Sequence, residues 1–188
     1  MRKVSLREKF GWGCCILLLM VVPKLPAQTW VEMRVHVTEK SVTPRVNGWV
    51  SGNITSKLGL FAWFQVDKAY GESYGGMSFS PTPWLQFGVG AGIEQADNPA
   101  RLGSFLWIGG KRQTVLAIYE HGGSGLWYKA EYNFALNGKV GIGLITERFK
   151  GAGPRLEMKI PKSPIIIWAA PLVNDGKIIG LTGVRLRL

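Results

Sequence analysis

The chain has 188 residues, a formal net charge of +11 and 46% hydrophobic residues, a composition that argues against an intrinsically disordered protein. It is long enough for one domain with a substantial core. Its two cysteines, Cys14 and Cys15, both precede residue 28. A domain that begins after them therefore has neither a disulfide framework nor a thiolate metal site.

Residues 1–27 have the order of a secretory signal peptide. The basic segment "MRKVSLREKF" comes first, a short apolar run follows from Cys14 to Val22, and the small residue Ala27 ends the segment. The run is shorter than the ~20 residues that a spanning helix needs, although an uncleaved membrane anchor is the alternative. Removing residues 1–27 takes away five basic residues and one acid, which leaves 18 and 11 and a net charge of +7.

From residue 28 to the end, apolar and polar residues alternate, and turn signals recur about every 8–14 residues. The segments 30–38 and 46–55 are expected to form two first strands or an N-terminal extension, and ten further strands are expected between Lys57 and Leu188. The alternation is clearest in residues 30–37, 84–95, 125–136, 155–160 and 183–188. The segments 58–66, 101–110 and 164–173 carry apolar residues on both faces, but they are short and rich in aromatic and branched residues, as strands are.

The connections favour an up-and-down order of strands. Every other turn signal is tight, at 55–57, 80–83, 109–113, 137–138 and 161–164. The intervening ones are similar or somewhat longer, at 39–45, 68–73, 95–100, 121–125, 150–153 and 174–177. The sequence thus predicts a single all-β domain over 28–188, an antiparallel barrel of 10–12 strands with shorter turns at one end.

Alternation alone does not say which face is inside. Twelve strands carry roughly 60 apolar side chains, counting about five per strand, which is more than the inner wall of a closed barrel can hold. A two-sheet sandwich could enclose them and is the soluble rival. Glycines such as Gly88, Gly90, Gly92, Gly141 and Gly143 take the polar face, where a curved wall around a crowded lumen needs close approach.

Large apolar residues lie near several predicted strand ends, where amphipathic rings favour membrane interfaces. They are Trp84, Trp107, Tyr119, Phe134 and Trp168. With the export signal and the cysteine-free domain, this pattern resembles a bacterial outer-membrane β-barrel of the small porin-like class. Such barrels often end in an alternating strand with a terminal aromatic, whereas "LTGVRLRL" alternates but ends in Leu188. The resemblance implies outer-membrane localisation and a transmembrane barrel with apolar residues facing lipid.

This orientation assigns two sets of site residues. The lumen is expected to contain Glu32, Arg34, Glu94, Lys129, Glu131, Arg155, Glu157, Lys159, Arg185 and Arg187, and also Lys57 and Asp67. The lipid-facing set is Leu85, Phe87, Val89, Ile93, Tyr128, Tyr132, Leu156, Met158, Leu186 and Leu188. A charged lumen of this kind is either a salt-bridged plug or a water-filled path that mildly prefers anions. Barrels of 8 strands are filled and those of about 16 are open, and twelve lies between them.

Other functions have weaker support. A Ser and a His in "HGGSG", His121 and Ser124, could serve a lipid-modifying enzyme, but three residues apart in a glycine-rich loop they are a poor catalytic signal. A soluble periplasmic barrel or sandwich that binds an apolar ligand is the other alternative. No cofactor and no metal site are expected.

The expected partners are outer-membrane lipid, lipopolysaccharide near loop residues Lys68 and Lys150, small solutes or ions, and, by class resemblance, the barrel-assembly machinery. The basic charges alternate with apolar residues and form no run, so a nucleic-acid partner is not expected.

Overall fold

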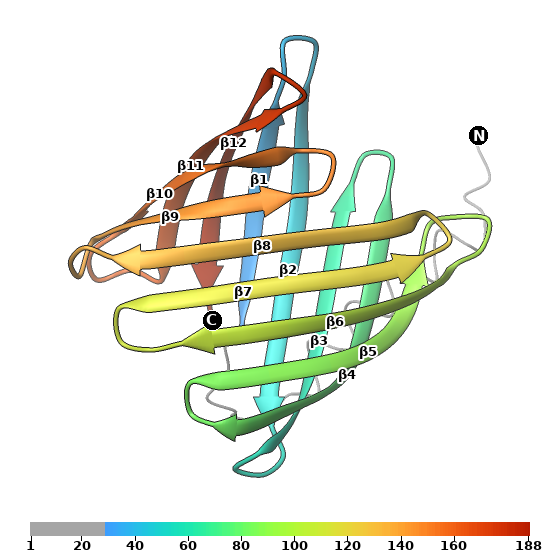
Figure 1. Ribbon diagram of the computed structural model, residues 1–188, viewed down its shortest axis with the longest axis vertical. Helices are drawn as coiled ribbons and strands as arrows, with labels where there is room; N and C mark the ends of the chain where they lie inside the picture. Colours follow the sequence, from blue (N-terminus) through green and yellow to red (C-terminus); the bar gives the residue numbers. More distant parts are fainter. Residues whose placement is uncertain (1–28) are drawn as a thin grey trace, which may run out of the picture.

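The computed structural model describes residues 29–188, which form one closed antiparallel barrel of twelve strands (Figure 1). The predicted signal peptide lies outside the described residues. The strands are β1 (Trp30–Val37), β2 (Val42–Asn53), β3 (Leu58–Asp67), β4 (Gly71–Thr82), β5 (Leu85–Glu94), β6 (Ala100–Gly109), β7 (Gln113–Gly122), β8 (Gly125–Ala135), β9 (Val140–Glu147), β10 (Gly151–Lys159), β11 (Ile165–Asn174) and β12 (Lys177–Arg187). Within the described range there is no helix long and apolar enough to cross a membrane.

Each strand pairs with its neighbours in the chain, and β1 pairs with β12 to close the ring. The closing register runs from Trp30 opposite Arg187 to Val37 opposite Gly180. Closure leaves no unpaired edge, which is the condition for placing a sheet in hydrocarbon. It also puts the start of β1 and the end of β12 at the same end of the barrel. We call this end the terminus end, and we call the opposite end the loop end.

The predicted difference in loop length between the two ends is wrong. All eleven connections have two to five residues, at both ends of the barrel. Several predicted turns overlap strands, because proline and glycine were taken as turn residues; 39–45, 68–73, 80–83, 121–125 and 150–153 are examples. Strand β2 begins at Val42 and includes Pro44, which pairs with Val35, and β10 begins at Gly151.

The alternation has a definite sidedness. In β5 the exposed residues include Phe87 at 44%, Val89 at 68% and Ile93 at 58%, whereas Gly88 and Glu94 are buried. Thirty-one large apolar residues of the described chain are exposed in this way, while Glu32, Arg34 and other charged residues have no exposed area. A soluble sheet protein has the reverse arrangement, since soluble monomers rarely expose apolar surface on this scale.

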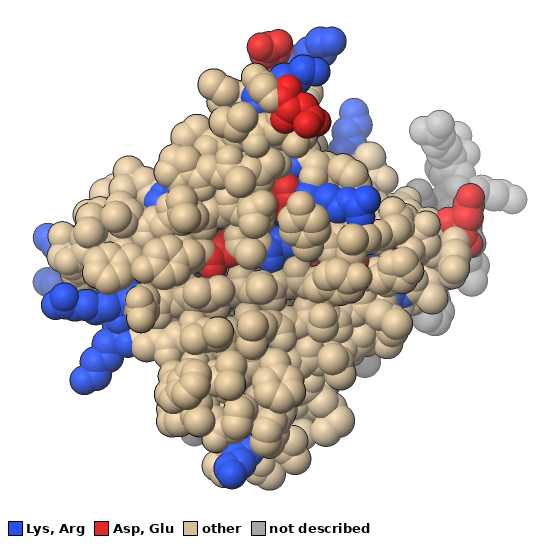
Figure 2. Space-filling view, in the orientation of Figure 1, with Lys and Arg blue, Asp and Glu red and all other residues tan. Residues whose placement is uncertain are grey.

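Figure 2 shows the outer wall from one side, and the area over β5, β6 and β7 is almost entirely free of charge between the two ends of the barrel. The segments with apolar residues on both faces are strands, and their second apolar face points into the barrel. Phe61 and Trp63 of β3, Phe105 of β6 and Trp168 of β11 are all at most 4% exposed.

Inward-facing glycines make room for these rings. A Cβ on Gly88 would lie 2.4 Å from the Phe105 ring, and one on Gly103 would lie 2.3 Å from the Tyr74 ring. Both distances are far shorter than a carbon–carbon contact of about 3.5–4.0 Å. The predicted reason for glycine on the inner face, a crowded lumen, is therefore correct at Gly88, and Gly103 is a further position of the same kind.

The substitution Gly103→Ala is expected to destabilise the barrel by about 1–3 kcal/mol, because Tyr74 is only 3% exposed and cannot move away from the added methyl group. The measurement is urea unfolding in detergent, followed by loss of heat-modifiable gel mobility. Gly110→Ala is the control, since nothing lies within 4 Å of its Cβ position, and equal stability of the two variants would contradict the crowding argument.

Candidate functional site in the barrel lumen

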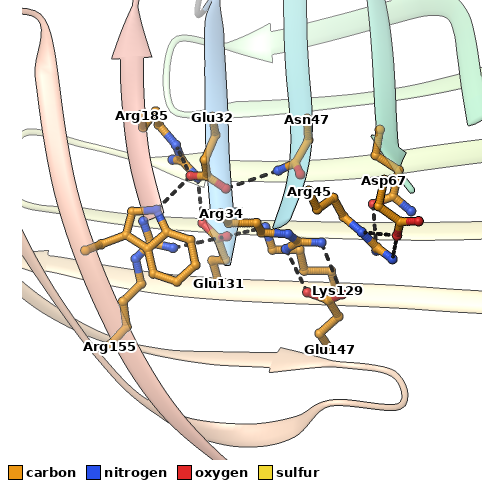
Figure 3. A network of polar contacts seen from close by, with 12 residues as sticks. Glu32, Arg34, Arg45, Asn47, Asp67, Lys129, Glu131, Glu147, Arg155 and Arg185 are labelled. Atoms are coloured by element: carbon orange, nitrogen blue, oxygen red, sulfur yellow. Dashed lines mark hydrogen bonds and ion pairs between the residues drawn. The ribbon is translucent and has the colours of Figure 1, made fainter. Parts of the chain in front are cut away.

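The middle of the lumen is held by a buried ionic network (Figure 3). Glu32 of β1 lies at its centre. Its carboxylate accepts hydrogen bonds from Arg185 Nε at 2.7 Å, from Trp168 Nε1 at 2.9 Å and from Asn47 Nδ2 at 3.1 Å. Three donors from β2, β11 and β12 thus converge on one side chain that has no contact with solvent. The three donors are held in place by their strands, so their hydrogen bonds can compensate the cost of burying the charge of Glu32.

A second pair in the network joins β1 to the opposite wall. Arg34 donates two hydrogen bonds to Glu147 of β9, at 2.8 and 3.2 Å, and both side chains are fully buried. This two-pronged geometry is the strongest form of an arginine–carboxylate pair. Because β1 and β9 are not neighbours in the sheet, the pair crosses the lumen and connects the two sides of the barrel.

Glu131 of β8 links the remaining bases. Its carboxylate lies 2.5 Å from Lys129 Nζ, 3.3 Å from Arg155 Nη1 and 3.6 Å from Arg185 Nη2. The guanidinium of Arg155 also lies 4.2 Å from the centre of the Trp168 ring. Glu157 contacts Arg155 at 3.6 Å. The network contains as many acids as bases, so its formal charge is balanced. The acids are Glu32, Glu131, Glu147 and Glu157, and the bases are Arg34, Lys129, Arg155 and Arg185.

A separate cluster lies near the loop end, around Arg101 of β6. Three carboxylates surround its guanidinium: Glu72 at 2.7 Å, Glu94 at 2.8 Å and Glu120 at 2.7 Å. Glu94 also accepts hydrogen bonds from Ser124, both backbone and hydroxyl, and thereby anchors the turn between β7 and β8.

Tyr70, in the loop between β3 and β4, belongs to the same cluster. Its hydroxyl donates to Glu94 at 2.5 Å and lies 2.7 Å from Glu72. Burial and the hydrogen bond to Glu94 raise the pKa of Tyr70 above its usual value, so the phenol keeps its proton and remains a donor. The cluster therefore fixes two connections across the loop end.

Aromatic side chains fill much of the lumen beside the charges. The rings of Trp49, Phe61 and Phe105 lie 4.7 to 5.3 Å apart, and Trp30 packs edge-on against Trp63 at 5.8 Å. A second apolar group is formed by β9, β11 and β12, with Ile145, Trp168, Ala170, Leu172 and Leu181. The lumen is thus packed with both charges and rings.

The expected lumen residues fall into two groups. Glu32, Arg34, Glu94, Lys129, Glu131, Arg155 and Arg185 are at most 9% exposed and point inward. Glu157, Lys159 and Asp67 are half-buried, Arg187 is exposed at the rim, and Lys57 is an exposed turn residue that lies outside the lumen. The residues of the lipid-facing set are on the outer wall, where Leu85 is half-buried and the other nine are exposed.

The expected interfacial aromatic residues are only partly on the outside. Trp84 and Tyr119 are more than half exposed, but Trp168 is 1% exposed in the lumen and Trp107 packs against the interior aromatic group. The interfacial position of Trp107 and Trp168 was predicted from their proximity to strand ends. That prediction is wrong because β6 and β11 are apolar on both faces, so an aromatic residue there can point inward. Four buried lumen residues were not predicted: Glu72, Arg101, Glu120 and Glu147. The signal that could have found them is that each alternates with small or apolar residues along its strand.

The two residues considered for catalysis are not paired. His121 is exposed and alternates with the buried Glu120, so it lies on the outer face, whereas the Ser124 hydroxyl bonds to Glu94 and Arg101. In residues 29–188 no group of three or more His, Cys, Asp or Glu side chains is arranged to hold a metal ion.

A closed antiparallel barrel with an apolar exterior and a charged interior defines a transmembrane β-barrel architecture. No protein-family model matches the chain, and no curated protein sequence matches it significantly. Solved structures do match in fold. The KdgM porin aligns with a TM-score of 0.58 and 12% identity over 85% of this chain and 99% of the porin.

Two other structures are similar. The Acinetobacter baumannii outer membrane protein Omp33 has a TM-score of 0.53 and 11% identity, over 88% of this chain and all of that protein. Outer membrane phospholipase A from Escherichia coli has a TM-score of 0.54 and 9% identity, over 90% and 93%. The chain therefore has the fold of the bacterial outer-membrane β-barrels, which is shared by porins and by an enzyme.

Removing one member of the cross-lumen pair is expected to be costly. Arg34→Met leaves the carboxylate of Glu147 buried without its partner, which typically costs about 3–5 kcal/mol in the free energy of unfolding. The double variant Arg34→Met/Glu147→Leu removes both charges and should recover most of that loss. Urea unfolding of both variants in detergent checks this, and a double variant as unstable as the single one would contradict it.

Proposed function

We propose that this protein is a bacterial outer-membrane β-barrel of porin-like architecture whose lumen is closed at rest by its own side chains. One observation carries the proposal: each of the twelve strands contributes at least one inward side chain that is less than 9% exposed. One such residue per strand is Glu32, Asn47, Trp63, Tyr74, Glu94, Phe105, Ile118, Lys129, Ile145, Arg155, Trp168 and Leu181. A water-filled lumen would leave these side chains accessible.

The orientation in the membrane follows from the export route. Residues 1–27 would serve as the signal peptide, and a chain that inserts from the periplasm as short hairpins leaves both of its ends on the periplasmic side. The terminus end then faces the periplasm and the loop end faces outward. Outer-membrane lipid surrounds the wall, and insertion would use the barrel-assembly machinery.

The loop end is the part that would meet lipopolysaccharide, and the two lysines proposed for this contact differ. Lys68 is exposed and available, whereas Lys150 is half-buried, and burial lowers the pKa of Lys150. We therefore assign the contact to Lys68 rather than to Lys150.

Small ions are the solutes that the closed lumen would pass if it opened. A porin with the same fold has been seen with disordered oligogalacturonate, which is an anionic sugar chain. In this chain the half-buried Lys159 and the exposed Arg187 lie at the periplasmic rim, so an opened path would admit anions in preference to cations.

The closed lumen predicts little or no steady ion conductance for the wild-type protein in planar bilayers. Trp49→Ala/Phe105→Ala removes two rings that are in contact across the lumen at 4.7 Å, and this variant should conduct. Phe79→Ala/Phe87→Ala, which removes a similar pair from the outer wall, is the matched control and should stay closed. A wild-type protein that conducts as well as the lumen variant would contradict the proposal that the lumen is closed.

We also propose that the barrel is not a hydrolase, although a phospholipase has the same fold. The outward position of His121 and the bonding of Ser124 to Glu94 support this. The reconstituted protein is expected to release no fatty acid from phospholipid, and Ser124→Ala should leave that baseline unchanged. Hydrolysis that disappears in Ser124→Ala would contradict the proposal.

A further inference from the structure

The outer wall has a groove of about 870 Å³ across β8, β9, β10 and β11. Two rows of cross-strand neighbours border it. One row contains Tyr132, Leu144 and Pro154, and the other contains Phe134, Ile142, Leu156 and Ala169, as given by the pairing of the four strands. Apart from Arg155, all the lining residues are uncharged, and most of them are apolar and exposed. The groove therefore belongs to the apolar outer surface rather than to the lumen.

The wall is thin at the floor of this groove. Gly143 has no side chain, and the side chain of Arg155 is fully buried toward the lumen, so the main chain of these residues forms the floor. The ladder between β10 and β11 is also interrupted: Ala152 pairs with Val173, and the next pair is Leu156 with Ala169. Between them lie Pro154 and Pro171, which lack the N–H groups that a ladder uses.

The groove leads toward a basic part of the terminus end. The five connections at this end contain Lys57, Lys111, Arg112, Lys139 and Lys162 and no acidic residue, whereas the six at the loop end mix both signs. Figure 2 shows this as a group of basic residues at the left edge without acidic ones. None of these five bases forms an ion pair with another residue in 29–188.

Two exposed bases, Lys139 and Lys162, lie in the connections that follow the groove strands at the terminus end. The backbone N–H of Lys159, at the end of β10, donates to the carbonyl of Lys139 at 2.7 Å, so the two residues are cross-strand neighbours, and Lys162 is in the next connection. Ile142 and Lys139 are three residues apart, as are Leu156 and Lys159, which corresponds to about 10 Å along a strand. One leaflet of a bilayer is about 15 Å of hydrocarbon, so an acyl chain with its headgroup at these lysines reaches the groove.

We propose that β8 to β11 form a binding site for an anionic phospholipid of the periplasmic leaflet, with its phosphate at Lys139 and Lys162 and an acyl chain in the groove. The site rests on the proposed membrane insertion but not on the closed lumen. The bases supply the charge complementarity, since unpaired lysines at a membrane surface attract anionic lipid. The recess between apolar side chains supplies the shape that holds one chain in place.

The experiment measures which lipid stays on the purified full-length protein. The protein is reconstituted in nanodiscs that contain equal amounts of phosphatidylglycerol and phosphatidylcholine, extracted in mild detergent and analysed by native mass spectrometry. The wild type should retain phosphatidylglycerol in preference. Lys139→Gln/Lys162→Gln should reduce that preference about 30-fold, the factor expected for the loss of two cations near an anionic lipid.

Ala169→Trp fills the groove and should lower the retention of both lipids. Two variants are the matched controls, Ala91→Trp on the exposed outer face of β5 and Lys57→Gln in a connection that does not adjoin the groove, and both should behave like the wild type. Equal retention of the two lipids by the wild type would overturn the anionic preference. Equal effects of Ala169→Trp and Ala91→Trp on lipid retention would show that the groove is not the binding site of the acyl chain.

Heat-modifiable gel mobility of every variant separates these outcomes from a failure of the proposed function. A wild-type protein that folds and stays monodisperse without any amphiphile would refute membrane insertion itself. Folded, inserted variants that differ in no lipid readout would refute the lipid site alone.

Discussion

The pairing of β1 with β12 is the constraint on which the other features depend. Eight residue pairs, from Trp30 opposite Arg187 to Val37 opposite Gly180, close the ladder into a ring. Without them two strands would present unpaired N–H and C=O groups, which hydrocarbon cannot satisfy. Closure also forces every strand to alternate between one inner and one outer face, so each residue has a fixed side. The apolar exterior and the charged interior follow from that geometry.

Closure removes a set of charged side chains from bulk water, and the interior must compensate them. It does so because acids and bases are equal in number and are joined by ion pairs. Four acids and four bases form ion pairs in the middle of the lumen, and one of these pairs, Arg34–Glu147, crosses the lumen between β1 and β9. Twelve strands enclose more space than these groups fill, and the rings of Trp49, Phe61 and Phe105 occupy the rest. Since no connection within residues 29–188 exceeds five residues, the lumen of the described barrel is filled by side chains and not by a folded-in loop.

Much of this fold could be predicted because alternation is a local property. Period two predicts the bounds of β1 and places Glu32, Lys129 and Glu131 on the polar face of their strands, and the turn signals add the range of 10–12 strands. The inward direction of that face needed a further argument, the excess of apolar side chains over what a closed barrel can enclose. What the pattern did not predict depends on other strands. Arg101 gathers Glu72, Glu94 and Glu120 only because of the register of β4 to β7, which no single segment encodes. Pro44 and Pro81 were predicted in turns but lie inside strands, because proline was taken as a turn residue.

Charged residues in different parts of the barrel have different roles, some in stability and others in binding. The middle is balanced, the loop end has three carboxylates around Arg101, and the connections of the terminus end carry bases only. Balanced, buried charges hold the walls together and leave nothing for a ligand to neutralise. Bases without partners at a rim contribute little to stability, because exposed charges gain little from distant ones. Their excess is therefore best explained by anions outside the protein, and the apolar groove beside them favours anions that carry acyl chains.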